Sequence, residues 1–244
     1  MSNASFDLGH MEAAATQART AHLCAELSGS EWLRTWVRGM QSLIAYWGDH
    51  FEEAVAFASS VRGHASAQGS VTVRLASIEA RAHARLGNAE GVETALEAAA
   101  HARETISHPD EYAGMMAFPM EKQLFHGSTC QVWLGGEPRL RRAAQEASRA
   151  VSMFEQAPPR QRRIGEMCLA RLDLAAARLG SGELDGAAEQ VRAVFVEAAN
   201  RRTDSVRRRL TQVRDQLQTP RVKTSPLAAS LTDEIIEFCA PAIP

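Results

Sequence analysis

A chain of 244 residues with a formal net charge of −2 is long enough to bury a large core, and its charge balance argues against bulk electrostatic binding of nucleic acid. Apolar residues make up 45% and aromatic residues only 6%, so alanine and leucine must supply most of the packing. The four cysteines are too widely spaced for a disulfide framework or a zinc site, no stretch is apolar enough to span a bilayer, and the start lacks a signal peptide pattern. We therefore expect a cytoplasmic protein that binds no cofactor and no metal and makes no membrane contact.

A bulky apolar residue is followed directly by glycine at the ends of several helical patterns, with an alanine-rich stretch soon after each glycine. The pairs are Leu8-Gly9, Trp47-Gly48, Leu86-Gly87, Leu134-Gly135 and Leu179-Gly180. The glycines are 39, 39, 48 and 45 residues apart. A repeat of this length, helix–glycine turn–helix, is typical of a stacked helical solenoid.

The N-terminal segment before the first glycine turn is too short for a full helix. We expect residues 1–8 to be a disordered or tag-like start, followed by a helix over about 10–28 that has no partner before it. Because half a repeat exposes an apolar face, we expect either a further N-terminal segment or another subunit to cover that helix.

Apolar residues recur at helical spacing in the next two helix pairs. In the first of these helices, Trp32, Trp36, Met40 and Trp47 form part of one continuous apolar stripe, and Ser30 is a suitable N-cap. Alanines on the second helix of each pair allow close packing. The four helices are expected at about 31–47, 51–68, 70–86 and 89–106.

The regular rhythm is interrupted between Ile106 and Pro119 by a long connection. Connections of this length often form binding lids or are disordered. Met115, Met116 and Met120 gather here, and methionine clusters suit promiscuous apolar binding. We favour the simpler interpretation, a loop that folds over the helices and packs into irregular gaps.

The C-terminal half returns to the helical pattern, and no alternating β pattern occurs in the sequence. Proline at a first helical position marks two of the helix starts. We expect an all-α superhelical solenoid of antiparallel helix pairs with about eleven helices, in which residues 9–218 form the repeat domain and residues 219–244 a capping helix and tail. The C-terminal helices are expected at about 119–134, 138–156, 161–180, 184–198, 203–218 and 227–239.

Candidate binding residues follow from the predicted turns, because each glycine turn places the first helix of its pair on the concave face. Polar residues predicted on that face are Arg38, Ser42, Arg74, Ser77, Arg81, Lys122 and Thr129. Arginine forks match carboxylate and phosphate groups. We therefore take Arg38, Arg74, Arg81 and Lys122 as candidate ligand-binding residues in a concave groove. The alternative is that they are ordinary solvated or ion-paired side chains.

The sequence contains no pattern typical of catalysis or metal binding. His22 and Cys24 are the closest pair of metal-type ligands, but two residues apart on a helix they point to different faces. There is no glycine-rich phosphate loop and no nucleophile elbow. The run Arg207-Arg208-Arg209 is interpreted as a solvated helix face. We expect the protein not to be an enzyme.

A set of motifs in the C-terminal half occurs in a characteristic order. They are Phe118-Pro119, Lys122-Gln123, Pro158-Pro159, Arg163-Ile164-Gly165-Glu166, Ala170-Arg171-Leu172-Asp173-Leu174-Ala175, Gly182-Glu183-Leu184-Asp185-Gly186-Ala187 and Arg202-Thr203. Together they resemble the helical-repeat half of Xre-type helix-turn-helix transcriptional regulators from high-G+C bacteria. The glycine turns are similar to tetratricopeptide-type repeats, and the resemblance covers nearly the whole chain.

The resemblance implies a domain that senses a ligand or protein and forms a homodimer, with a peptide, a small acidic molecule or a protein partner in the concave groove. The DNA-binding domain of that family has no counterpart in this sequence, so we expect DNA contact only through a domain missing here. A stand-alone helical repeat adaptor that holds another protein is the alternative. A third hypothesis, an enzyme of small-molecule metabolism, would require convergent titratable groups in a closed pocket.

Overall fold

The computed structural model describes residues 1–61, 69–106, 114–199 and 202–240, and within these ranges every regular element is a helix. The elements are α1 (Ser2–Asp7), α2 (Met11–Ser28), α3 (Glu31–Trp47), α4 (Phe51–Ser59), α5 (Val71–Arg85), α6 (Ala89–Glu104), the 3-10 helix η1 (Gly114–Met116), α7 (Met120–Leu134), α8 (Glu137–Gln156), the 3-10 helix η2 (Pro159–Gln161), α9 (Ile164–Ser181), α10 (Leu184–Glu197), α11 (Asp204–Leu217) and α12 (Pro226–Cys239).

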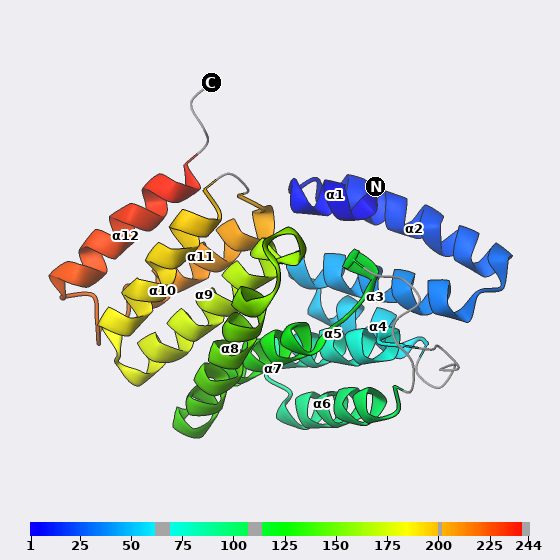
Figure 1. The fold of residues 1–244 in the computed structure, drawn as a ribbon, viewed down its shortest axis with the longest axis horizontal. Coiled ribbons are helices and arrows are strands. Elements are labelled where there is room, and N and C mark those ends of the chain that lie inside the picture. Colours follow the sequence, from blue (N-terminus) through cyan, green and yellow to red (C-terminus); the bar gives the residue numbers. More distant parts are fainter. Residues whose placement is uncertain (62–68, 107–113, 200–201, 241–244) are drawn as a thin grey trace.

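Consecutive helices form pairs, and the first helices of successive pairs pack against one another in chain order. Thus α3 contacts α5, α5 contacts α7, α7 contacts α9, and α9 contacts α11. The second helices α2, α4, α6 and α8 each pack against the first helix of the next pair. In Figure 1 the chain passes from α1–α6 on one side of the molecule to α9–α12 on the other. The predicted all-α class and the sequential packing of helix pairs are confirmed; the superhelical curvature stays a prediction.

Small side chains account for the close packing of the second helices. Ala54, Ala99, Ala147 and Ala187 lie on α4, α6, α8 and α10, and each is completely buried. Larger apolar side chains from the first helices fill the rest of the core. Close packing and dispersion attraction between these side chains stabilise it. The alanine-rich pattern therefore has the packing role that the sequence indicated.

Local signals explain where several helices begin. The Ser30 side chain accepts a hydrogen bond from the backbone N–H of Leu33 at 3.3 Å, so its predicted role as an N-cap is confirmed. Asn88 caps α6 in the same way, accepting from the N–H of Gly91 at 2.9 Å. Pro226 occupies the first position of α12, where its missing N–H costs nothing.

The glycines of the repeat pattern do not all mark turns. Gly87 ends its helix pattern with φ of 69°, in the left-handed region where glycine is favoured. Gly180 was predicted to mark a turn, but α9 continues to Ser181 and the left-handed residue is Gly182, with φ of 87°. A Cβ atom on Gly180 would lie 2.6 Å from Cδ1 of Leu140. A side chain at position 180 would therefore require Leu140 on α8 to shift.

The N-terminal segment differs from the expected disordered start. Ser2–Asp7 form the helix α1, which packs on α2, and the ring of Phe6 is buried in the main core. The Ser2 hydroxyl donates a hydrogen bond to the carbonyl of Ala14 at 2.8 Å. The helix α1 also contacts α11, far along the chain (Figure 1). The buried ring of Phe6 and the hydrogen bond from Ser2 hold α1 against α2. Seven residues are too few for a helical apolar pattern to reveal this helix in the sequence.

Two expected segments fall partly outside the described residues. The helix predicted for 51–68 ends at Ser59, and 62–68 are not among the described residues. Of the long connection, 107–113 lie outside them as well. Its described end contains η1, with Met115 half exposed, and then Phe118, which is buried against α5 and α6. This end of the connection folds over the helices, as we expected.

The last helix covers apolar surface at the end of the row. In α12, Leu231 and Ile235 are buried against the core, and the helix contacts both α10 and α11.

Among the helices of the described ranges, none combines the length and the apolar character that crossing a bilayer requires.

Candidate functional site

The first helices α3, α5, α7, α9 and α11 all contribute side chains to one small cavity inside the protein, which we call the central cavity. Its volume is about 10 Å³, enough for about one water molecule. Because helices from so many pairs meet here, any molecule in this cavity touches much of the helical row at once. The cavity is lined by Tyr46, Trp47, Arg81, Phe125, Thr129, Leu169, Asp173, Arg209 and Gln212.

Arg81, a predicted binding residue, lies at the central cavity and is enclosed by aromatic rings. Its side chain is only 3% exposed. Its guanidinium carbon lies 4.4 Å from the ring centre of Tyr46, 5.5 Å from that of Trp47 and 5.3 Å from that of Phe125. Its Nε atom is buried without a hydrogen-bond partner. Cation–π contacts contribute up to about 2 kcal/mol each, whereas burying a charge without a counter-ion costs several kcal/mol. Arg81 is thus a buried cation that its neighbours only partly compensate.

Asp173 on α9 is the carboxylate of the central cavity, and both of its oxygens lie within hydrogen-bonding distance of donors. The side chain is 1% exposed. Oδ1 accepts a short hydrogen bond from Nη2 of Arg209, and Oδ2 accepts from Thr129 at 2.5 Å and from Ser128 at 3.1 Å. Arg209 in turn donates to Gln212 at 2.9 Å. This network joins α7, α9 and α11, and among the described residues Asp173 forms its ion pair with Arg209 and not with Arg81.

Arg74 and Lys122, two further predicted binding residues, connect adjacent first helices. Nη1 of Arg74 on α5 donates to the backbone carbonyl of Trp36 on α3 at 3.0 Å, and the guanidinium carbon lies 5.0 Å from the Trp36 ring centre. Burial lowers the pKa of Arg74 to about 10. Nζ of Lys122 on α7 lies 2.8 Å from Oε1 of Glu166 on α9. Burial lowers the pKa of Lys122, and the charge of Glu166 opposes that shift.

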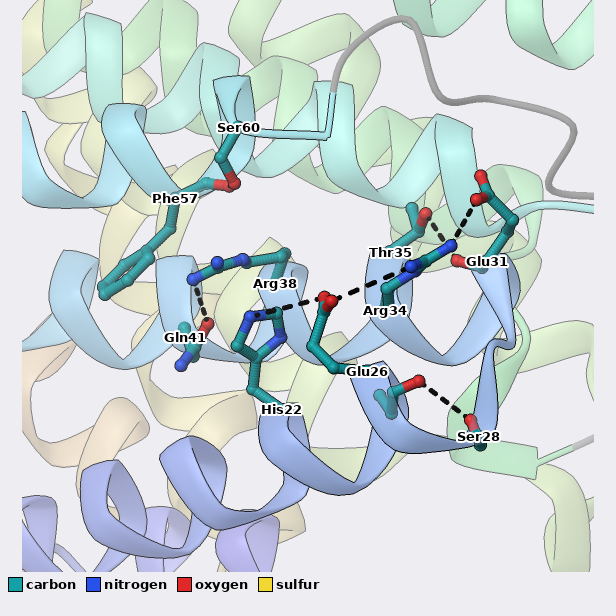
Figure 2. Close-up of polar contacts among 11 residues, drawn as sticks. His22, Glu26, Ser28, Glu31, Arg34, Thr35, Arg38, Gln41, Phe57 and Ser60 are labelled. Atoms are coloured by element: carbon teal, nitrogen blue, oxygen red, sulfur yellow. Dashed lines mark hydrogen bonds and ion pairs between the residues drawn. The ribbon is translucent and has the colours of Figure 1, made fainter.

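Arg38, the fourth predicted binding residue, does not line the central cavity. Figure 2 shows it on α3 in a polar cluster that also includes residues of α2 and α4. It donates to Oε1 of Gln41 at 3.0 Å, and its guanidinium carbon lies 5.7 Å from the ring centre of Phe57. His22 lies in the same cluster, with Nε2 3.7 Å from Oε1 of Glu26. Burial lowers the pKa of His22, and the positive charge of Arg38 adds to the effect.

Sequence reasoning missed two charged residues of the central cavity. Asp173 stands alone as a carboxylate among Leu172, Leu174 and small residues, and an acidic residue in such an apolar helical run was the signal that could have marked it. Arg209 was expected on a solvated face with the two preceding arginines, but it is 4% exposed and bonded to Asp173. That expectation is wrong for Arg209 because α11 turns this residue toward α9. For the exposed Arg207 it holds.

A second, larger hollow lies on the surface between α8 and α9, and we call it the outer groove. Its volume is about 730 Å³. Most of the side chains contributed by α8 are polar and exposed, which suits a water-filled surface groove. It is lined by Arg141, Ala144, Gln145, Ser148, Arg149, Ser152, Met153, Gln156, Leu174, Arg178, Ser181 and Glu183.

No family model, no curated protein and no solved structure matches this chain. Within residues 1–61, 69–106, 114–199 and 202–240, histidine, cysteine and carboxylate side chains form no cluster that could hold a metal ion.

His126 on α7 lies beside this buried cationic region and makes stability depend on pH. Its ring is edge-on to those of Phe118 and Phe125, each 5.0 Å away between centres. Burial holds the pKa of His126 well below its ordinary value of 6.5, and the charges of Arg81 and Lys122 act in the same direction. The native protein therefore excludes a proton that the unfolded chain accepts.

This exclusion predicts a loss of stability in mild acid. Because the pKa of His126 is depressed in the native protein, the contribution of its neutral ring to the free energy of unfolding is fully present above pH of about 6.5. As the pH falls below that value, the free energy of unfolding decreases by up to about 1.4 kcal/mol per pH unit. Urea unfolding at several pH values between about 7.5 and 5.5 measures this decrease. The His126→Phe variant should show a shallower decline than wild type, and the variant His101→Phe on the exposed face of α6 should not. Equal slopes in all three proteins would contradict the assignment.

Proposed function

We propose that this chain is the ligand- or protein-sensing and dimerisation domain of a cytoplasmic bacterial transcriptional regulator, and that DNA is bound by a helix-turn-helix domain outside this sequence. The ordered C-terminal motifs that resemble Xre-type regulators support the regulator part. The sensing part rests on one observation: the first helices of five pairs converge on a single cavity that contains an incompletely compensated cation, Arg81.

The convergence suggests how a bound signal would be transmitted. A ligand at the central cavity touches α3, α5, α7, α9 and α11 together, so it would favour whichever spacing of these helices fits it best. A ligand shifts such an equilibrium only as far as its affinities for the two arrangements differ. Changed spacing would then alter the surfaces through which two subunits of the proposed homodimer, or a partner protein, make contact.

A transcript profile in the organism that encodes the protein tests this proposal. Deletion of the gene should change a defined set of transcripts, and an Arg81→Gln replacement should change the same set at an equal protein level. Arg85→Gln is the matched control, because Arg85 is on the same helix and also stacks on aromatic rings, those of Phe51 and Trp133, but does not line the central cavity. The control should give the wild-type profile. An unchanged profile in the deletion strain would reject the regulator proposal.

The outer groove favours a second candidate function, that of an adaptor that holds another protein. It is far larger than the central cavity, and Arg149 lies in it as an exposed cation on α8. An adaptor would lose one specific cross-linked partner in Arg149→Glu but keep it in Arg160→Glu, a matched change of an exposed arginine outside the groove. That loss, combined with an unchanged transcript profile after gene deletion, would favour the adaptor.

A further inference from the structure

The charges around the central cavity do not balance. Arg81 and Arg209 each bring a positive charge to its lining, and Asp173 brings the only negative charge among the lining residues. The oxygens of Asp173 already accept hydrogen bonds from Arg209, Ser128 and Thr129. Within the described part of the chain, Asp173 forms its ion pair with Arg209, and no carboxylate forms one with Arg81.

Arg81 also has unused hydrogen-bonding capacity. A guanidinium carries five N–H donors, and the Nε of Arg81 is buried without an acceptor. Its close neighbours are the rings of Tyr46, Trp47 and Phe125. Ring faces attract a cation electrostatically, but they offer no lone pair to its N–H groups. The Arg81 side chain is only 3% exposed and is surrounded by these rings. A bound anion would therefore stabilise its charge.

Gln212, another lining residue, supplies a further hydrogen-bond donor. The side-chain oxygen of Gln212 on α11 accepts a hydrogen bond from Arg209 at 2.9 Å. Its amide N–H groups are consequently left to donate. Arg81 on α5 and Gln212 on α11 thus both line a space of about 10 Å³, which has room for about one water molecule.

We infer that the central cavity binds one small monovalent anion against Arg81: a chloride ion, or the carboxylate group of a small effector. The inference rests on the proposed function, because it names the chemistry of a ligand at the same site. A single negative charge matches the single uncompensated cation. Chloride is larger than a water molecule, so it requires a small widening of the cavity, whereas the carboxylate of a larger molecule requires the surrounding helices to move further apart.

Anion-dependent thermal unfolding of the whole chain tests the inference. At constant ionic strength, replacing sulfate by chloride up to about 300 mM should raise the melting temperature by about 5 °C relative to Arg81→Gln, and this difference should grow with the logarithm of the chloride concentration. Sulfate is too large for the cavity and serves as the balancing salt. Arg81→Gln should remove the rise. Arg85→Gln should keep it, since Arg85 is paired with Asp49 at 3.2 Å and lies outside the lining.

A parallel titration with formate distinguishes the two sources of the anion. A rise with chloride and formate alike, both abolished in Arg81→Gln, supports a site for any small monovalent anion. A rise with formate only assigns the site to carboxylate-bearing effectors. A melting temperature that responds to neither anion, or that responds equally in wild type and Arg81→Gln, overturns the inference.

A measurement on the wild-type protein alone covers the case in which Arg81→Gln does not fold. Crystals grown in bromide should show one anomalous scattering peak beside the Arg81 guanidinium, and an empty cavity in such crystals, together with no response to formate, overturns the inference. This result is separable from the regulatory proposal. Failure of anion binding leaves the gene-deletion transcript profile unaffected, and an unchanged transcript profile leaves the melting experiment unaffected.

Discussion

Replacing Asp173 with alanine is expected to lower the free energy of unfolding by about 3–5 kcal/mol. The change removes the carboxylate that accepts hydrogen bonds from Arg209, Thr129 and Ser128. It leaves the 4% exposed Arg209 as an unpaired cation close to Arg81, which already lacks a counter-ion. Urea unfolding followed by circular dichroism measures the change.

Two comparisons isolate the cause of that loss. Asp215→Ala removes an exposed carboxylate that lies 3.0 Å from Arg214, and it should cost less than about 1 kcal/mol. The double variant Asp173→Leu with Arg209→Leu should recover most of the stability, because it removes both members of the ion pair and leaves neither of them as a lone buried charge. A loss for Asp173→Ala no larger than that for Asp215→Ala would contradict the role assigned to the buried network.

Replacing Phe118 with alanine should also destabilise the protein strongly, by about 3–5 kcal/mol. Phe118 is 2% exposed and packs against α5 and α6. Its backbone N–H donates to the Ser70 hydroxyl at 2.7 Å, and its carbonyl accepts from Arg103 at 2.6 Å. Loss of the ring leaves a cavity under the connection that leads into α7, and thermal unfolding by calorimetry measures the effect.

The neighbouring methionine provides the control for Phe118. Met115 is 51% exposed, so Met115→Ala should change the unfolding free energy by less than about 0.5 kcal/mol. Phe118→Leu retains much of the apolar volume and should fall between wild type and Phe118→Ala. Equal stability of Phe118→Ala and Met115→Ala would show that the connection is not anchored through its aromatic ring.

The structure also changes what we expect from the candidate binding residues. The sequence predicted that Arg74 and Arg81 lie in a concave groove with side chains available to bind a ligand. In the structure both are buried and stacked on aromatic rings, and Arg74 in addition donates to a backbone carbonyl. Replacing them together by alanine would therefore alter packing as well as binding. For this reason the anion experiment uses glutamine at Arg81 alone and compares it with Arg85.

The sequence by itself determined the helical class, the pairing of helices and most helix boundaries. Apolar residues at a period of about 3.6 define the buried face of each helix, and signals such as Ser30 and Gly87 act within a few residues of the boundary they mark. These are local properties of the chain, so no tertiary contact is needed to read them. Three local features were wrong: α1 was too short for its pattern to stand out, the helix expected at 51–68 ends at Ser59, and the turn after α9 lies at Gly182 instead of Gly180.

Only the tertiary structure decided which polar residues are enclosed and which partners they meet. Asp173 and Arg209 are 36 positions apart, and Arg81 is surrounded by rings from both earlier and later helices. Helical periodicity shows which residues share a face of one helix, but it does not show which face of another helix will lie against it. Burial of a charge depends on that second helix. The central cavity is therefore a property of five helices packed together, and no single segment of the sequence contains it.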